Sequence, residues 1–168
     1  IRLTPILAGS AGQGKTSVVH QFVKQIDFED RKEGGNGWDL RKVRLAHSDP
    51  TDIKGVPHFS QKTDGRVVSV WAAPDIFPLK GLPESADGKK WVIFLDEFTQ
   101  ATPVMQNIGA NILDGIIGDY EIDWDRCFIV TGGNRPEAGA GAFAVLTNVR
   151  TRIVWSHVKT TFSEWETW

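Results

Sequence analysis

The sequence is poor in sulfur, because its 168 residues include one cysteine, Cys127, and one methionine. A single cysteine excludes a disulfide framework within the chain, which agrees with a reducing, cytoplasmic compartment. Cys127 opens an apolar run at residues 127–130. A thiol in such surroundings is more often buried and inert than reactive, so we expect Cys127 to belong to a core.

Long apolar runs and a strong charge of either sign are also absent. No run approaches the ~20 residues that span a membrane, and no secretory signal is visible, so we expect no membrane partner. The formal net charge of −2 gives no reason for a strong general attraction to nucleic acid, although it leaves a local basic patch open. The length suits one domain with a sizeable core. Because the chain begins at Ile1 without a methionine, we expect a piece of something larger.

The sequence does contain a glycine-rich loop near its start. This loop fits the phosphate-binding pattern G-x-x-x-x-G-K-[ST] at every fixed position. An apolar run at residues 5–8 predicts a strand before the loop, and apolar residues at helical spacing predict a helix from about residue 15. The alternative is a glycine-rich turn before a helix, but a chance match in such a chain is on the order of one in a hundred. The residues of the pattern are Gly9, Ser10, Ala11, Gly12, Gln13, Gly14, Lys15 and Thr16, followed by Ser17.

The chemistry of this loop favours a nucleoside triphosphate. Successive backbone N–H groups in a glycine-rich curl form a nest for anions. The helix N-terminus adds unpaired donors and the positive end of its dipole. Lys15 would neutralise the β- and γ-phosphates, and the Thr16 hydroxyl would bind Mg²⁺. The loop therefore predicts ATP-type binding together with magnesium.

Beyond the loop, strand-like and helix-like segments alternate. Apolar runs and alternation predict further strands at residues 41–46, 91–95, 127–131 and 153–158. Thr102 can cap a helix that Pro103 opens and that ends before Gly115. This order predicts an α/β fold with a central, mostly parallel five-stranded sheet flanked by helices, over residues 1–161.

The connecting segments carry turn and hairpin signals. Residues 30–38 are polar and glycine-rich, which predicts a surface loop, and residues 47–52 predict a turn. Turn chemistry at residues 62–65 before a β-prone stretch predicts a hairpin, and a shorter one is predicted within residues 117–124. Ser163 and Glu166 form a capping box, so we expect a new helix to start within residues 162–168.

Two acids follow the apolar run at residues 91–95. In an open parallel sheet, ligands bind beyond the carboxyl ends of the strands, so Asp96 and Lys15 should emerge at one edge. Asp96 can then hold Mg²⁺, and Glu97 can orient and deprotonate a water that attacks the γ-phosphate. The alternative for Glu97 is a solvated acid. Asn134, after the strand at residues 127–131, could help to hold the water or could be an ordinary turn residue.

Arg150 and Arg152 lie just before the last predicted strand. An isolated arginine is usually a solvated charge. An arginine that reaches the γ-phosphate of a neighbouring subunit would instead accelerate hydrolysis strongly.

Taken together, these residues resemble AAA+ ATPases, most closely the MoxR-like group. The similarity includes the segment Asp52-Ile53-Lys54-Gly55-Val56-Pro57, Gln106, and the terminal Ser163-Glu164-Trp165. The resemblance implies a P-loop NTPase core in which residues 9–16 are Walker A and Asp96-Glu97 are Walker B. It further implies Asn134 as sensor 1, Arg152 as the arginine finger with Arg150 as the alternative, and residues 57–71 as a hairpin insertion that could face a ring pore.

The sequence departs from this family in three places. An arginine that the family often has near Thr99-Gln100 is absent, and Thr151 replaces the usual asparagine before Arg152. The helical lid with its second sensor arginine would follow Trp168. Without the lid, we expect slow hydrolysis by this segment alone.

The resemblance implies a hexameric ring that uses Mg²⁺-dependent ATP hydrolysis to remodel a protein partner, which the sequence does not identify. A nucleic-acid motor or loader of the AAA+ class is one alternative. The other is an ATP-gated assembly scaffold with little turnover, which the presence of Glu97 argues against. The ring size and the source organism are left open by the sequence.

Overall fold

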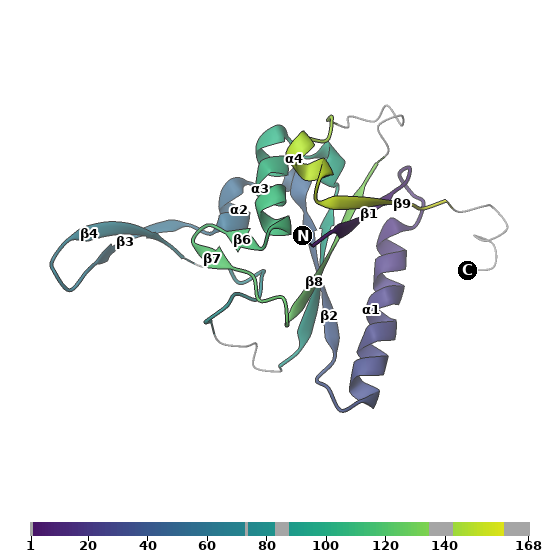
Figure 1. Ribbon diagram of the computed structural model, residues 1–168, viewed down its shortest axis with the longest axis horizontal. Coiled ribbons are helices and arrows are strands. Elements are labelled where there is room, and N and C mark those ends of the chain that lie inside the picture. The colour runs from purple at the N-terminus through teal and green to yellow at the C-terminus, as the bar shows by residue number, and fades with distance from the viewer. Residues whose placement is uncertain (1, 73, 83–87, 135–142, 160–168) are drawn as a thin grey trace.

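The computed structural model describes residues 2–72, 74–82, 88–134 and 143–159. Five strands form the main sheet in the order β2-β5-β8-β1-β9, and every neighbouring pair is parallel. The prediction of a central five-stranded parallel sheet is confirmed (Figure 1). The strands are β1 (Thr4–Ala8), β2 (Trp38–Arg44), β5 (Lys90–Asp96), β8 (Cys127–Gly133) and β9 (Ile153–His157).

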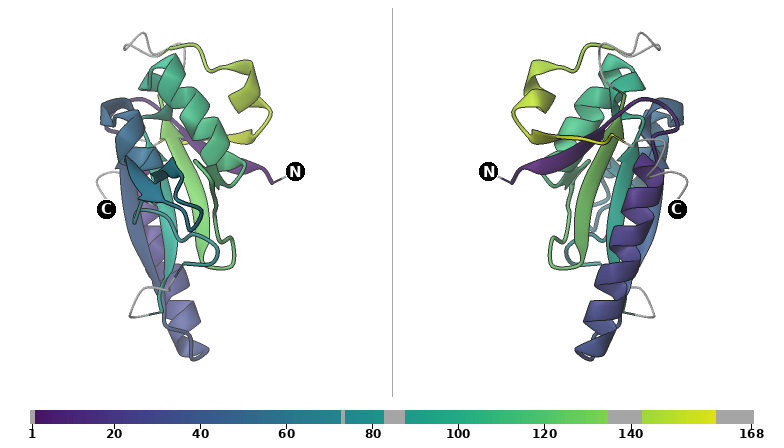
Figure 2. Two further views of the ribbon diagram at one scale, coloured as in Figure 1. Left: turned by 90° about the vertical axis from the view of Figure 1, so that its left-hand side faces the viewer. Right: turned by 90° about the vertical axis from the view of Figure 1, so that its right-hand side faces the viewer.

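Helices cover both faces of the sheet (Figures 1 and 2). Of the helices in the described ranges, the long α1 lies on one face and the shorter α2, α3 and α4 lie on the other. Two 3-10 turns, η1 (Leu45–His47) and η2 (Phe98–Gln100), follow β2 and β5. Among the described residues, no helix is both long and apolar enough to cross a membrane. The helices are α1 (Lys15–Lys32), α2 (Pro50–Lys54), α3 (Pro103–Leu113) and α4 (Thr147–Arg150).

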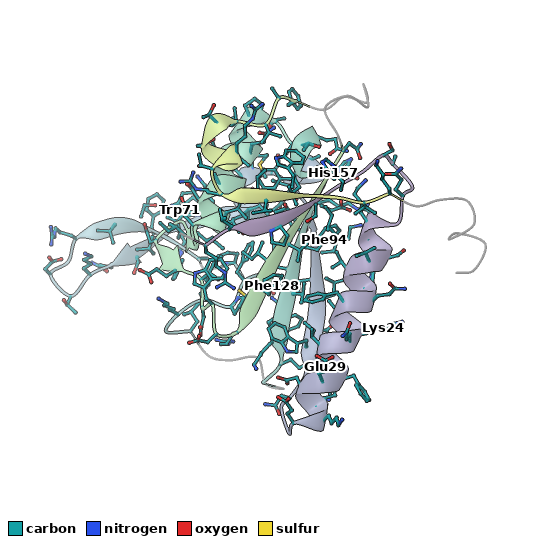
Figure 3. All side chains as sticks on the ribbon, turned by 45° about the vertical axis from the view of Figure 1, so that its right-hand side comes forward. Lys24, Glu29, Trp71, Phe94, Phe128 and His157 are labelled. Atoms are coloured by element: carbon teal, nitrogen blue, oxygen red, sulfur yellow. The ribbon has the colours of Figure 1, made fainter. Side chains whose placement is uncertain are left out.

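The face under α1 carries the smaller of two apolar cores. Val19 and Val23 of α1 are buried there against Val92 and Phe94 of β5 and Val130 of β8. Figure 3 shows Phe94 and Phe128 on the sheet beside α1, whereas Lys24 and Glu29 point from the helix into solvent. This helix therefore packs through one narrow stripe, and its first turn is left open beside the sheet edge.

The opposite face carries the larger core. Side chains of α3 such as Ile108 and Ile112 pack there with Ile93 and Leu95 of β5 and with Phe98 of η2. Cys127 also lies in this core, and burial raises the pKa of its thiol to about 12, so the expectation of a buried, unreactive cysteine agrees with the structure.

Two predicted connections are only partly right, since a shorter loop at residues 33–37 joins α1 to β2. Residues 30–38 are not one loop, because α1 continues to Lys32 and β2 already begins at Trp38. Asp27 Oδ1 accepts the backbone N–H of Trp38 at 2.8 Å, and Asp30 Oδ2 accepts that of Gly37 at 2.8 Å. These carboxylates accept hydrogen bonds from backbone N–H groups in the tight turn between α1 and β2. Composition alone predicts a longer loop there.

Residues 47–52 are also not a simple turn. The predicted strand at 41–46 ends at Arg44, η1 follows, and α2 begins at Pro50. The Asp49 backbone N–H donates to Asp52 Oδ2 at 2.8 Å, so Asp52 caps the short helix that Pro50 opens. Helix α4 was not predicted either, since four residues are too few for a periodic pattern.

Both predicted hairpins are present. Strands β3 (Pro57–Gln61) and β4 (Val67–Trp71) pair antiparallel and project from the body of the molecule (Figure 1), and β6 (Ile116–Ile117) pairs with β7 (Tyr120–Glu121). Gly55 at the base of the long hairpin has φ 85°, and a Cβ there would lie 1.9 Å from the Ala72 carbonyl oxygen. The Asp52–Pro57 segment thus has a structural role at the start of the hairpin. The helix expected at residues 162–168 lies outside the described residues.

Candidate functional site

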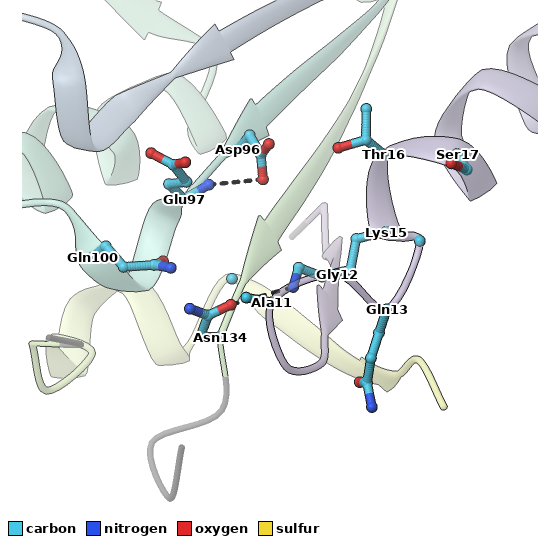
Figure 4. Close-up of a pocket in the computed structure, with 12 residues that line it drawn as sticks. Ala11, Gly12, Gln13, Lys15, Thr16, Ser17, Asp96, Glu97, Gln100 and Asn134 are labelled. Atoms are coloured by element: carbon cyan, nitrogen blue, oxygen red, sulfur yellow. Dashed lines mark hydrogen bonds between the residues drawn. The ribbon is translucent and has the colours of Figure 1, made fainter. Parts of the chain in front are cut away.

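A pocket of about 420 Å³ opens at the carboxyl ends of β1, β5 and β8 (Figure 4). The first-turn residues of α1 and the two acids at the carboxyl end of β5 line this pocket together, so the prediction that Lys15 and Asp96 emerge at one edge is confirmed. Gly9 and Ser10 lie just outside the lining, and neither Arg150 nor Arg152 belongs to it. The lining residues are Ala11, Gly12, Gln13, Gly14, Lys15, Thr16, Ser17, Asp96, Glu97, Gln100, Gly133 and Asn134.

The loop of residues 9–14 curls because two of its glycines adopt positive φ angles, 79° at Gly12 and 74° at Gly14. Side chains other than glycine rarely adopt this conformation. Gly14 directly precedes α1, so the first-turn N–H groups of an 18-residue helix face the pocket. The Gly9 N–H donates to the Gly133 carbonyl oxygen at 3.3 Å and ties the loop to β8. A curl of this kind at a helix N-terminus has the geometry that can hold an anion.

Lys15 is folded back onto the loop. Its Nζ donates to the carbonyl oxygens of Gly9 at 2.8 Å and Ser10 at 2.9 Å, and to Asn134 Oδ1 at 3.2 Å. Burial lowers the pKa of Lys15, and the negative charge of Asp96 opposes that shift. The ammonium is therefore held inside the pocket by neutral acceptors, which a more strongly charged anion can replace.

Thr16 and Asp96 face each other across the pocket (Figure 4), and both contact a third side chain, Lys42 of β2. Lys42 Nζ lies 2.7 Å from Asp96 Oδ2 and 3.2 Å from Thr16 Oγ1. The two oxygens therefore converge on one point that already holds a positive charge. Oxygen ligands of this kind are those that Mg²⁺ prefers. The pair fits a divalent cation.

The described residues would not complete a metal site by themselves. No group of three or more His, Cys, Asp or Glu side chains that could hold a metal occurs in the part of the chain that the structure describes. Mg²⁺ commonly takes one or two protein ligands and completes its coordination with waters and substrate phosphates. The site therefore suits a metal that arrives with a phosphorylated ligand.

Glu97 has an unusual backbone and a single side-chain partner. Its φ of 58° is the only positive φ at a non-glycine residue among those described. Such a conformation costs about 1–3 kcal/mol and is enriched at functional sites. Its N–H donates to Asp96 Oδ1 at 2.9 Å, and its Oε2 lies 2.7 Å from His47 Nδ1. Oε2 is otherwise buried without a hydrogen-bond partner in the described ranges. The contact with His47 therefore fixes the direction of this carboxylate.

Hydrogen bonds to the backbone of Asn134 hold this residue in place, and its side chain lies in the pocket. The Asn134 N–H donates to Thr99 Oγ1 at 2.9 Å, and the same hydroxyl lies 3.1 Å from the Asn134 carbonyl oxygen. A Cβ on Gly133 would lie 2.7 Å from Thr99 Cγ2, so the close approach of β8 to η2 requires glycine. These contacts aim the Asn134 side chain at Lys15.

The two arginines differ in their contacts. Arg152 forms a forked ion pair with Asp114, in which Nε lies 2.6 Å from Oδ1 and Nη2 lies 2.8 Å from Oδ2. Arg150 is exposed, and its Nε donates to the Val145 carbonyl oxygen at 3.0 Å. Neither arginine serves the pocket of its own chain.

Sequence reasoning missed four side chains at this site. Gln100 lines the pocket, and Lys42, His47 and Thr99 contact residues that line it. Lys42 reaches the site because β2 pairs with β5 in a register that puts Lys42 opposite Phe94, and no local pattern reveals that register. His47 lies in η1, which the sequence presented as a turn. Gln106, singled out as a family feature, is fully buried and has a structural role, since it accepts the Leu146 N–H at 3.0 Å.

Comparison with known proteins bears on the fold alone. No protein-family model matches the chain, and no curated protein sequence matches it. Among solved structures, the fold is similar to the crystal structure of NtrX from Brucella abortus, with a TM-score of 0.53 and 15% sequence identity over 94% of this chain. The chain spans about a third of the NtrX chain, 33% of its length. The shared feature is an α/β fold with a central parallel sheet flanked by helices.

Proposed function

We propose that this chain binds ATP with Mg²⁺ and hydrolyses it. One observation carries the proposal, namely that three parallel strands deliver a phosphate-type loop, two acids and an amide to one pocket. A generic anion site would need only the loop. The addition of Asp96, Glu97 and Asn134 opposite Lys15 supports phosphoryl-transfer chemistry.

Each side chain has a distinct part in this proposal. The N–H groups of the loop and of the first turn of α1 hold the phosphates, and the Lys15 ammonium moves from its carbonyl partners to the β- and γ-phosphate oxygens. Thr16 and Asp96 would hold Mg²⁺, which when bound neutralises the developing charge on the phosphates.

In this proposal, Glu97 and Asn134 position and activate the attacking water. Glu97 orients the water and takes its proton, which requires the carboxylate to turn from His47 toward the γ-phosphate. The Asn134 amide, once released by Lys15, is free to hold the same water.

The proposal extends to the AAA+ class and its MoxR-like group, with a P-loop core, a ring of subunits and a protein partner that is remodelled. Exposure of Arg150 and the absence of both arginines from the pocket lining support a contribution from a neighbouring subunit. The projecting β3–β4 hairpin, with Phe59 82% exposed, supports a contact with a partner. A nucleic-acid motor and a low-turnover scaffold are the competing functions.

The test combines ATP binding and ATP turnover in wild type and in Glu97→Gln. Because the amide cannot accept the proton, we expect turnover to fall by about 100-fold or more while ATP affinity stays within a few-fold. Glu33→Gln, which removes an exposed carboxylate after the end of α1, is the matched control and should behave as wild type.

Other results would change the proposal. Wild type that does not bind ATP in the presence of Mg²⁺ would refute it. Unchanged turnover in Glu97→Gln would place the base elsewhere. DNA-stimulated turnover with a steep loss at higher salt would favour the nucleic-acid motor. ATP-dependent assembly with negligible turnover in wild type would favour the scaffold.

A further inference from the structure

Lys42 places its ammonium between the two protein oxygens that the proposed function assigns to Mg²⁺. Its Nζ contacts Asp96 Oδ2 at 2.7 Å and Thr16 Oγ1 at 3.2 Å. It also lies 5.8 Å from the centre of the Phe94 ring. A carboxylate, a hydroxyl and the face of an aromatic ring together form a cation site, and a side chain of the same protein occupies it.

An ammonium and a magnesium ion exclude each other at this site. Mg²⁺ needs oxygens at about 2.0–2.1 Å, so a metal on Thr16 and Asp96 would lie within a few ångströms of the Lys42 charge. The Asp96 side chain is only 11% exposed, so water screens the repulsion poorly. A hydroxyl that already accepts a hydrogen bond from the ammonium also has less electron density for a metal.

The Lys42 side chain can adopt a second position, away from Thr16 and Asp96. It approaches from β2 and does not belong to the lining of the phosphate pocket. It does line a separate hollow between α1 and β2, together with Asp27 and Asp39. This hollow also contains Lys24 and His20, so its charge is mixed. A flexible four-carbon stem can still move the Lys42 ammonium toward it without a change in the backbone.

We propose that Lys42 is a resident cation that competes with Mg²⁺ for Thr16 and Asp96 and thereby sets how much Mg²⁺ the protein needs. The proposal rests on the proposed function for the identity of the metal. Without metal, Lys42 neutralises Asp96 and keeps the site ordered. Metal that arrives with nucleotide displaces the ammonium, so apparent metal affinity is reduced by the fraction of molecules in which Lys42 holds the site.

The experiment measures the Mg²⁺ concentration that half-saturates binding of a fluorescent ATP analogue. In Lys42→Met the competitor is gone, so we expect this concentration to fall by about 10-fold. Lys42→Gln, which keeps a hydrogen-bond donor but removes the charge, should shift in the same direction and covers the case in which the methionine variant folds poorly.

Lys90→Met is the matched control. Lys90 also pairs with one carboxylate, Asp30 at 3.2 Å, and also lies over one ring, Trp38 at 5.5 Å, but at the opposite end of the β2–β5 pair. Its Mg²⁺ requirement should equal that of wild type. This control separates the position of the charge from the loss of any lysine.

A second readout uses Mg²⁺ alone and no nucleotide. We expect added Mg²⁺ to raise the melting temperature of Lys42→Met, whose Asp96 lacks a counterion, more than that of wild type or Lys90→Met. This arm separates the two proposals, because a protein that failed to bind ATP would refute the proposed function and would still report competition for the metal.

Three results would overturn the inference. An unchanged Mg²⁺ requirement in both Lys42 variants would show that the ammonium does not compete. A higher requirement would show that Lys42 assists the metal. Nucleotide binding in excess EDTA that is as tight as with Mg²⁺ in wild type, and is lost in Lys42→Met, would show that Lys42 replaces the metal.

Discussion

The loop wall of the pocket consists of residues 11–17, and the acid wall consists of Asp96, Glu97, Gly133 and Asn134. The loop wall is held mostly by its own backbone, through glycines with positive φ and the start of α1. The acid wall is held by side chains from elsewhere in the chain, namely Lys42, His47 and Thr99.

Because the two walls are held in place differently, we expect them to contribute differently to ATP binding and to ATP hydrolysis. An anion nest made of contiguous backbone is formed as soon as the local sequence folds. The acid wall brings the carboxylates of Asp96 and Glu97 together. The Lys42 ammonium of β2 contacts Asp96, and the His47 imidazole of η1 contacts Glu97. We therefore expect changes in the loop wall to affect ATP affinity, and changes in the acid wall to affect metal use and turnover.

The largest effect is expected from Lys15→Met in the loop wall. Loss of the ammonium removes charge-assisted hydrogen bonds to the phosphates, and we expect ATP affinity to fall by about 100-fold. Equilibrium titration with ATP and excess Mg²⁺ measures this. Lys24→Met, at an exposed position of the same helix, is the control. Equal ATP affinity in wild type and Lys15→Met would show that Lys15 does not bind the phosphates. It would contradict the claim that the loop wall determines ATP affinity.

A smaller effect is expected from Gly133→Ala in the acid wall. The added Cβ would lie 2.7 Å from Thr99 Cγ2 and 2.9 Å from Thr99 Oγ1. We expect a loss of about 1–3 kcal/mol in the free energy of unfolding, measured by denaturant titration, together with a lower rate of ATP turnover.

The variant that tests the cause of this loss is Gly133→Ala combined with Thr99→Ser. Serine keeps the hydroxyl that accepts the Asn134 N–H and removes Cγ2. We expect the double variant to recover part of the lost stability, which a double-mutant cycle detects as a coupling energy. Purely additive losses would show that the tight contact between Gly133 and Thr99 does not hold the acid wall in place.

The smallest effects are expected outside both walls, at the two arginines. Arg152→Ala breaks the forked pair with Asp114, whose side chain is 40% exposed, so we expect a stability loss of about 1 kcal/mol or less. The resemblance implies Arg152 as the arginine finger, with Arg150 as the alternative. Because Asp114 of the same chain holds Arg152, we favour the exposed Arg150, so Arg150→Ala should change stability little and lower turnover only in the assembled protein. Thermal melts and turnover at several protein concentrations separate these outcomes. Loss of turnover with Arg152→Ala alone would instead support Arg152 as the arginine finger.

The sequence was informative wherever a feature depends on neighbouring residues. The loop at 9–16, the start of α1, the capped start of α3 and the strand that ends in Asp96 all carry local patterns, and the structure places them as expected. The pairing of parallel strands then brings their carboxyl ends to one edge, which is why the positions of Lys15 and Asp96 followed from elementary rules.

What the sequence did not reveal depends on contacts between distant residues or on short capped segments. The position of Lys42 near Asp96 depends on the register of β2 against β5, and that of His47 near Glu97 on a 3-10 turn. Helix α2 is stabilised by the capping box of Asp49 and Asp52 and by a proline, without an apolar period. The positive φ of Glu97 could not be predicted either, because glutamate is not a residue type that favours this conformation.

The central claim is that Thr16 and Asp96 share a metal with a triphosphate that lies on the loop wall. A crystal structure of Glu97→Gln grown with ATP and Mg²⁺ tests it most directly. We expect phosphate density against the N–H groups of Gly12 to Thr16, a metal between Thr16 and Asp96, and Lys42 withdrawn from both oxygens. Nucleotide bound elsewhere, or a metal remote from Thr16 and Asp96, would contradict the account.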